Sequence, residues 1–169
     1  MPLTVAGIGC RASGDDGIGI ALVEGLPDPG PGGDVELVVW ENADALTLVA
    51  ELLERHGPVI VADCSDMKAP PGTWRFFDTA SAVLRVSPRN LSSHGLGAAE
   101  ALAMARDLGF TWPVYVFGVQ PYGVAPGRPM TPAMRARLPE LVRALNRTIR
   151  RIVRRSSAEE NASCRMPSN

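Results

Sequence analysis

The sequence predicts an α/β fold, a three-layer sandwich with helices on both faces of a mostly parallel, twisted sheet of about five strands. Short apolar runs alternate along the chain with segments of helical periodicity. One of them, PVIVAD (58–63), is almost wholly apolar, as is typical of a strand buried on both faces. The 169 residues, of which 46% are hydrophobic, suit one domain with a sizeable core.

The first part of the chain contains three strand patterns and two helical ones. A glycine-rich loop follows the first strand and leads into a helix, and the loop PDPGPGGD separates that helix from the second strand. The next helix is expected to close at Gly57. Strands are predicted over residues 3–8, 35–40 and 58–63, and helices over 16–26 and 43–57.

The second part of the chain completes the sheet and its outer layers. A short strand at an edge, a capped helix, a further strand and a final helix are predicted over residues 73–77, 92–109, 113–119 and 132–155. There is no internal repeat and no linker signal. Residues 1–155 are therefore expected to form a single domain, and 156–169 to be a disordered tail.

Bulk properties exclude several classes of protein. The formal net charge is −1, and no apolar run approaches the roughly 18 residues that span a bilayer. The start, MPLTVAGIG, lacks the basic region and cleavage site of a secretory signal. The three cysteines do not suggest a disulfide framework. We expect a cytoplasmic protein with no membrane association.

Charge is unevenly distributed along the chain. Residues 1–130 contain 8 Lys and Arg against 15 Asp and Glu, whereas residues 131–169 contain 9 against 3. The predicted last helix therefore has an arginine-rich face, either a solvated surface or a docking surface for an acidic partner. Nucleic acid is disfavoured as a partner, because the whole chain is slightly acidic and no aromatic residues are interleaved with the arginines.

Three potential metal ligands are predicted at one edge of the sheet. Asp16 follows the first strand, Asp63 ends the third, and His94 in SSHG begins a helix that starts on the same edge. Two carboxylates and an imidazole suit a divalent transition metal such as nickel or zinc. Each residue also has a structural interpretation: Asp15 and Asp16 as helix caps, Asp63 as an acceptor for loop amides, and His94 as part of a cap.

Two other chemistries compete for this edge. GIGCRA fits a loose dinucleotide-binding pattern, with Glu41 placed to bind a ribose, but two carboxylates at the helix start would repel a pyrophosphate. A cysteine–histidine nucleophile pair could combine Cys10 or Cys64 with His94. Otherwise each cysteine is a small, partly buried hydrophobic residue.

Taken together, five motifs resemble the hydrogenase maturation protease family over nearly the whole chain, to about residue 153. They are GIGCRASGDDGIG, VIVADCSDMKAPPGT, SSHGLG, VYVFGVQP and PMTP. The resemblance implies an α/β sandwich. It also implies an endopeptidase that removes the C-terminal extension of a nickel–iron hydrogenase large-subunit precursor once nickel has been inserted. That precursor is the implied partner, and a monomeric enzyme is expected.

The resemblance assigns the family's metal-contacting residues to Asp16, Asp63 and His94. The metal it implies is nickel carried by the substrate, although zinc or cadmium could occupy the same ligands. Two positions depart from the family pattern: Cys10 stands where asparagine is common, and the acid of the first loop is Asp16 where glutamate is frequent. No separate catalytic nucleophile or base is assigned.

Overall fold

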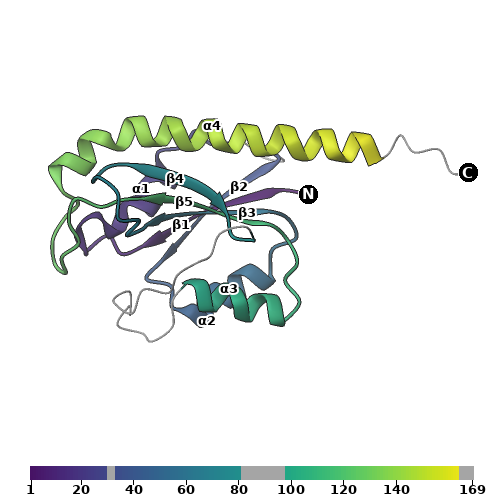
Figure 1. The fold of residues 1–169 in the computed structure, drawn as a ribbon, viewed down its shortest axis with the longest axis horizontal. Helices are drawn as coiled ribbons and strands as arrows, with labels where there is room; N and C mark the ends of the chain where they lie inside the picture. Colours follow the sequence, from purple (N-terminus) through teal and green to yellow (C-terminus); the bar gives the residue numbers. More distant parts are fainter. Residues whose placement is uncertain (30–32, 81–97, 164–169) are drawn as a thin grey trace, which may run out of the picture.

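The computed structural model describes residues 1–29, 33–80 and 98–163, and a five-stranded sheet lies at its centre (Figure 1). The strand order is β2-β1-β3-β5-β4. All neighbouring strands run parallel except β4, an edge strand antiparallel to β5. This confirms the predicted sheet and its edge strand. The strands are β1 (Leu3–Gly9), β2 (Val35–Glu41), β3 (Val59–Cys64), β4 (Trp74–Asp78) and β5 (Val114–Val119).

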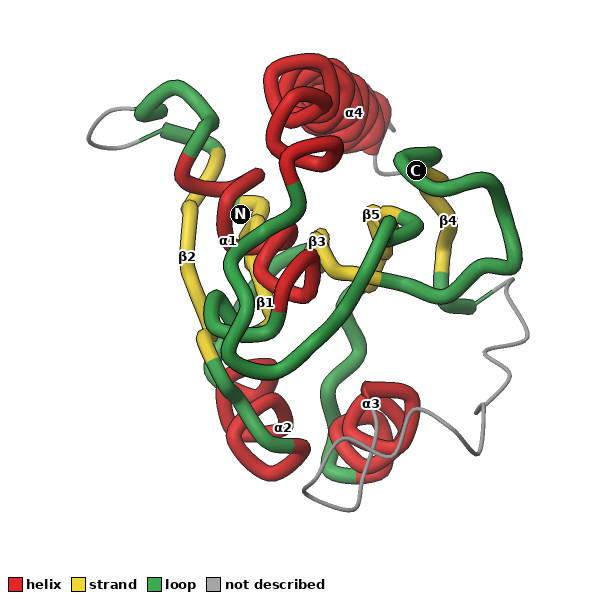
Figure 2. Tube along the Cα trace, turned by 90° about the vertical axis from the view of Figure 1, so that its left-hand side faces the viewer, coloured by secondary structure: helices red, strands yellow, loops and turns green. Residues whose placement is uncertain are grey.

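Helices cover both faces of the sheet, which completes the predicted three-layer sandwich. Figure 2 shows α2 and α3 together on one side and α4 on the other, and the core contacts place α1 with α4. Each face has its own hydrophobic core. The helices are a 3-10 turn, η1 (Gly14–Gly17), followed by α1 (Ile18–Glu24), α2 (Ala45–Leu53), α3 (Ala98–Asp107) and α4 (Pro132–Ser163).

Strand alternation decides which face each β3 side chain meets. Ile60 and Ala62 belong to the core under α1 and α4, and Cys64 packs against that core. Val59 and Val61 contact the core under α2 and α3. Because successive side chains of a strand point to opposite faces, Asp63 follows Val61 onto the α2 and α3 side.

The first two helices differ from their predicted bounds. The first α-helix was predicted to begin at residue 16, but a 3-10 turn precedes it and α1 starts at Ile18. Asp44 caps α2, since its carboxylate accepts a 2.8 Å hydrogen bond from the Thr47 N–H. That helix ends at Leu53 rather than at Gly57. Gly57 is required instead by close packing, because a Cβ there would lie 2.3 Å from the carbonyl oxygen of Pro2.

The last two helices also differ from the prediction. α3 begins at Ala98, and residues 92–97 of its predicted span lie outside the described ranges. Thr131 caps α4, since its hydroxyl accepts a hydrogen bond from the Met134 N–H at 3.2 Å. α4 continues to Ser163, so the predicted end near residue 155 is wrong for the helix. No described helix has the length and apolar character needed to cross a membrane.

Candidate functional site

The candidate site lies where the chain order of the sheet reverses. β1 sits between β2 and β3, so the connection after β1 leads to one side of the sheet, and β3 begins the other side. In open α/β sheets, ligands bind in the crevice outside the carboxyl ends of strands at such a switch point. Asp16 follows β1 and Asp63 is the penultimate residue of β3. The structure therefore brings these two predicted ligands to the same place.

Asp16 is oriented by the backbone of the loop that follows β1. It lies half-buried in the turn η1, and its Oδ2 accepts a 2.8 Å hydrogen bond from the Cys10 N–H. Burial raises the pKa of Asp16, and the Cys10 hydrogen bond opposes that rise. Because the donor is a backbone group, cysteine at position 10 supplies this contact as well as asparagine would.

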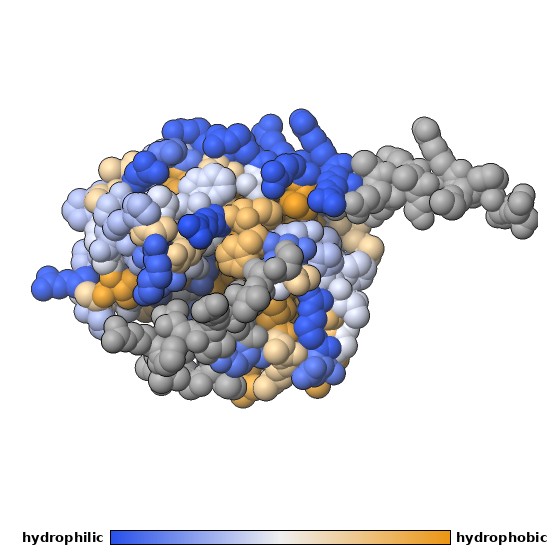
Figure 3. All heavy atoms as spheres, viewed as in Figure 1, coloured by the Kyte–Doolittle hydropathy of each residue, from blue (hydrophilic) through white to orange (hydrophobic). Residues whose placement is uncertain are grey.

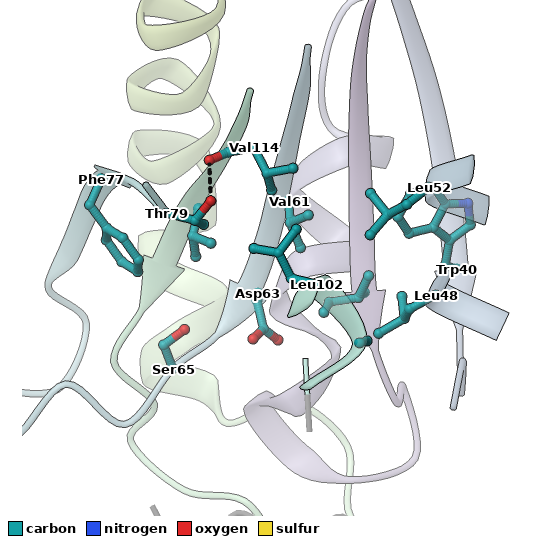
Figure 4. Close-up of a pocket in the computed structure, with 13 residues that line it drawn as sticks. Trp40, Leu48, Leu52, Val61, Asp63, Ser65, Phe77, Thr79, Leu102 and Val114 are labelled. Carbon is teal, nitrogen blue, oxygen red and sulfur yellow. Dashed lines mark hydrogen bonds between the residues drawn. The ribbon is translucent and has the colours of Figure 1, made fainter. Parts of the chain in front are cut away.

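Asp63 lies at one end of an apolar cavity of about 130 Å³ between the sheet and the two helices α2 and α3. Figure 4 shows its carboxylate near Ser65, with Trp40 and Leu52 on the opposite wall. Burial, followed by the negative charge of Asp16, raises the pKa of Asp63 to about 7, while a hydrogen bond from the Cys64 backbone opposes the rise. Asp16 and Asp63 are thus close enough to repel each other.

The third predicted ligand, His94, lies outside the described residues. Within the described ranges, no group of three His, Cys, Asp or Glu side chains is arranged to hold a metal ion. The structure therefore supplies a pair of neighbouring carboxylates at the predicted position, and the complete three-ligand set stays a prediction.

Asp15 has a role that sequence reasoning missed. The structure shows no side-chain helix cap by this residue; its carboxylate is fully buried and accepts four hydrogen bonds from a segment more than a hundred residues away. The donors are the backbone N–H groups of Tyr122 (2.9 Å), Gly123 (3.1 Å) and Thr131 (2.8 Å), and the Thr131 hydroxyl (3.0 Å). Asp15 and Asp16 are consecutive residues of a tight turn, where neighbouring side chains point in different directions. The sequence therefore contained a signal that only one of the two aspartates would face the site.

Asp15 thereby joins the loop after β1 to the proline-rich loop after β5. Backbone hydrogen bonds reinforce the connection: Gly14 N–H to Arg128 O at 2.8 Å, Asp15 N–H to Gly123 O at 3.0 Å, and Gly127 N–H to Ala12 O at 2.7 Å. Since Thr131 also caps α4, the same contacts fix the start of that helix. The rim beside Asp16 is therefore built from two loops that act as one unit.

The structure argues against Cys64 as a nucleophile. Its side chain packs against the core under α1 and α4, on the opposite face of β3 from Asp63. Burial and then the charges of Asp63 and Asp16 raise the pKa of the Cys64 thiol, which disfavours the reactive thiolate. Cys10 is a partly exposed free thiol beside the site.

The residue proposed to bind a ribose is engaged elsewhere. Glu41 forms an ion pair with Arg11, with a 3.0 Å distance between Arg11 Nε and Glu41 Oε2. The same arginine also contacts Glu24 at 2.7 Å. Both aspartates of the loop precede α1, where a bound pyrophosphate would have to meet free backbone amides. These features do not support the dinucleotide-binding interpretation.

Comparison with known proteins shows the family to which the chain belongs. Residues 43–148 match the family model of hydrogenase maturation proteases. No curated protein sequence matches the chain. The match covers more than half of the chain, and the chain belongs to the hydrogenase maturation protease family. It is therefore a hydrolase, an endopeptidase that processes the C-terminus of its substrate.

Solved structures share the fold over most of their length. The hydrogenase-maturating endopeptidase HybD from E. coli is 25% identical, with a TM-score of 0.69 over 89% of this chain and 93% of that one. An endopeptidase from Escherichia coli is also 25% identical, with a TM-score of 0.65 over 86% and 90%. The [NiFe] hydrogenase maturation protease HycI from Thermococcus kodakarensis, 17% identical, has a TM-score of 0.66 over 85% and 89%.

Proposed function

We propose that this enzyme cleaves the C-terminal extension from the large-subunit precursor of a nickel–iron hydrogenase and that it recognises nickel already bound by the precursor. Asp16, Asp63 and His94 are the residues proposed to contact that nickel. The observation that carries the proposal is the meeting of Asp16 and Asp63 at the switch point between β1 and β3. The family acts on hydrogenase large-subunit precursors, which supplies the substrate class.

The chemistry of the donor set fits a divalent cation. Asp16 and Asp63 are like-charged neighbours, and a cation between them would relieve their repulsion. One oxygen of Asp16 is already hydrogen-bonded to Cys10, while no described residue is bonded to the other. Carboxylate and imidazole ligands suit borderline metals such as nickel and zinc. Zinc or cadmium could therefore compete at the same ligands.

Three protein ligands leave coordination positions open. In this proposal the precursor fills them with the groups that already hold its nickel, so that a precursor without nickel docks poorly. The requirement makes nickel a check that maturation has reached the correct stage. The rim built by Asp15 keeps Asp16 in place for this contact, since the two residues are adjacent in η1.

The direct test is cleavage of a purified large-subunit precursor prepared with and without nickel. We expect the wild-type enzyme to process only the nickel-loaded form. Asp16→Asn, Asp63→Asn and His94→Ala should each lower kcat/KM by about a hundredfold or more, because loss of even an outer-shell partner of a metal ligand typically costs about 10–100-fold. Isothermal titration should show weaker nickel binding by the same variants.

Asp66→Asn is the matched control. Asp66 follows β3 closely but is exposed and paired with Lys68, so its loss should leave cleavage unchanged. Equal cleavage of the nickel-free precursor contradicts the recognition step. Unimpaired cleavage by the triple variant of Asp16, Asp63 and His94 contradicts the assigned site.

A further inference from the structure

Four arginines form a continuous stripe along the middle of α4. Arg143, Arg147, Arg150 and Arg154 are all exposed and recur at intervals of four, three and four residues. We call this set the arginine stripe. With 3.6 residues per turn, the four side chains fall within about 60° of the helix circumference and span about 17 Å along its axis. Figure 3 shows hydrophilic side chains gathered along α4 at the top of the molecule.

The arginine stripe points away from the protein core. The side of α4 that faces the sheet is apolar and buried, and it includes Leu141, Leu145 and Ile152. The stripe begins about 17 Å along the helix from Pro132, at 1.5 Å per residue. Since the start of α4 is fixed beside the site through Thr131 and Asp15, a partner bound to the stripe would contact the enzyme away from Asp16 and Asp63.

The charges of the stripe have no partner within the described part of the protein. No hydrogen bond or ion pair joins any of the four side chains to another described residue. The acidic residue Glu140 on the same helix pairs with Arg137 at 3.1 Å. Like charges at i,i+4, as in the pairs 143/147 and 150/154, destabilise a helix by about 0.2–0.5 kcal/mol each. No ion pair within the described residues relieves this repulsion, and an acidic partner would relieve it.

The position of the stripe along α4 excludes the helix dipole as the reason for its positive charges. Cations near the C-terminus of a helix are stabilised by its dipole, but that effect is confined to the last turn. The stripe ends at Arg154, whereas α4 continues to Ser163. Arg150 and Arg154 also line a groove together with Asp28 and Asp34, whose negative charges would repel an anion there, so an anionic partner would approach the exposed outer side of the helix.

The nature of the anion follows from the rest of the molecule. Residues 1–130 carry 15 acidic against 8 basic residues, so a long polyanion extending beyond α4 would meet repulsion. Where the side chains of α4 are described, its apolar face is buried, so this part of the helix has no exposed apolar face to insert into a membrane. A localised acidic patch on a folded protein matches both the size and the isolation of the stripe.

We infer that the arginine stripe is a docking site for an acidic surface of the hydrogenase large-subunit precursor, separate from the site of cleavage. The inference rests on the proposed function for the identity of the partner. Exposed charge pairs of this kind steer association and weaken with salt. The stripe therefore contributes to KM and to the association rate, and not to the chemical step.

The experiment compares two quadruple variants of the stripe with the wild type. All four arginines are replaced by glutamine in one and by lysine in the other, which keeps the charge. We expect the glutamine variant to raise KM about tenfold at low salt, the combined effect of several exposed pairs, with kcat within about twofold. The wild-type KM should rise with salt, the glutamine variant should lose that dependence, and the lysine variant should behave as wild type.

A second readout separates this inference from the proposed function. Fluorescence anisotropy with labelled precursor measures binding whether or not cleavage occurs. A wild-type enzyme that binds the precursor in a salt-dependent, stripe-dependent way without cleaving it contradicts the proposed function and supports the stripe. If the wild type and the glutamine variant bind the precursor with equal affinity and equal salt dependence, the proposed docking role of the stripe is overturned.

Alternative anions are tested with the same variants. Duplex DNA and phosphatidylserine vesicles serve as probes. Stripe-dependent binding to either, together with unchanged precursor affinity in the glutamine variant, also overturns the inference. Denaturation curves check that both quadruple variants fold. If either does not fold, the double variant Arg143→Gln/Arg147→Gln is used in place of the quadruple variants. Its expected effect on KM is smaller, about threefold.

Discussion

Asp63 lies one residue before the end of β3, beside an apolar cavity and near Asp16, and its burial and the charge of Asp16 raise its pKa to about 7. In the unfolded chain an aspartate has a pKa of about 3.9. Between these values the folded protein retains a proton that the unfolded chain has released. The free energy of unfolding therefore falls as pH rises from about 4 to about 7, and the loss is complete above that range.

Asp63→Asn should remove this penalty. We expect the variant to gain roughly 2–4 kcal/mol of unfolding free energy over wild type near pH 8, because one pKa unit corresponds to about 1.4 kcal/mol. The two proteins should differ by only about 0.5 kcal/mol near pH 4, where Asp63 is protonated in the folded state and about half protonated in the unfolded chain. Urea denaturation at the two pH values measures the difference. No gain at pH 8, or an equal gain at both pH values, would contradict the electrostatic explanation.

Asp66→Asn provides the control of opposite sign. Hydrogen bonds from Lys68 lower the pKa of Asp66, so that carboxylate favours folding above its unfolded pKa and its replacement cannot stabilise the protein at pH 8. A gain from both variants would indicate a general charge effect rather than the burial of Asp63.

A second prediction at the scale of single residues concerns the replacement of Asp15. Asp15→Ala leaves the N–H groups of Tyr122, Gly123 and Thr131 without their acceptor, and it removes a partner of the Thr131 hydroxyl. We expect a loss of about 3 kcal/mol or more in unfolding free energy. Hydrogen exchange at Tyr122 and Gly123 should accelerate. Asp15→Asn keeps one acceptor oxygen and should lose less; equal stability of the alanine variant and wild type would show that the joint between the loops is dispensable.

At the scale of the elements, α1 packs closely against the sheet at Gly19. A Cβ at Gly19 would lie 2.1 Å from the carbonyl oxygen of Ala62 and 2.5 Å from that of Ile8. Gly19→Ala must therefore push α1 away from β1 and β3. We expect a loss of about 3 kcal/mol or more, at the upper end of overpacking effects because the contacts are with backbone. Because η1 precedes α1 directly, cleavage activity should fall too.

Gly123→Ala is the matched control for this packing argument. The nearest atom to a Cβ at Gly123 is Thr131 Cγ2 at 3.8 Å, an ordinary contact. Urea denaturation of both variants separates close packing from the general effect of replacing glycine. If both substitutions cost the same, α1 is not held by the close approach at Gly19.

Local patterns predicted the elements well where burial alone determines them. The run 58–63 is buried on both faces as β3, and the short segment 73–77 became the edge strand β4, shifted by one residue. The predicted helix ends were less accurate because distant contacts determine them. The carboxylate of Asp15 holds the turn before α1 through residues 122–131, and Gly57 is needed for contact with Pro2.

The site followed the same division. The closeness of Asp16 and Asp63 could be predicted from the sequence, because the carboxyl ends of adjacent parallel strands meet at one edge of the sheet. The role of Asp15 could not, since no local pattern reveals a partner more than a hundred residues away. The placement of His94 lies outside the described residues and stays a prediction.

At the scale of the whole molecule, α4 connects the site to a distant surface. Its first turn is fixed by Thr131 and Asp15, its middle carries the arginine stripe, and its inner face fills the core under the sheet. The last described core residues on it are Ile152 and Val153. Figure 1 shows the end of the helix running past the edge of the sheet.

Removing the residues after 155 should therefore leave the domain intact. We expect a chain ending at Arg155 to keep its unfolding free energy within about 1 kcal/mol, because no described core residue is lost, and to keep its cleavage activity and the arginine stripe. A chain ending at Thr148 is the control. It loses Ile149 and Ile152, which are 6% and 7% exposed, and should lose at least about 4 kcal/mol. Urea denaturation of the two truncated chains decides the matter: a large loss from the shorter deletion would show that residues 156–169 belong to the folded domain.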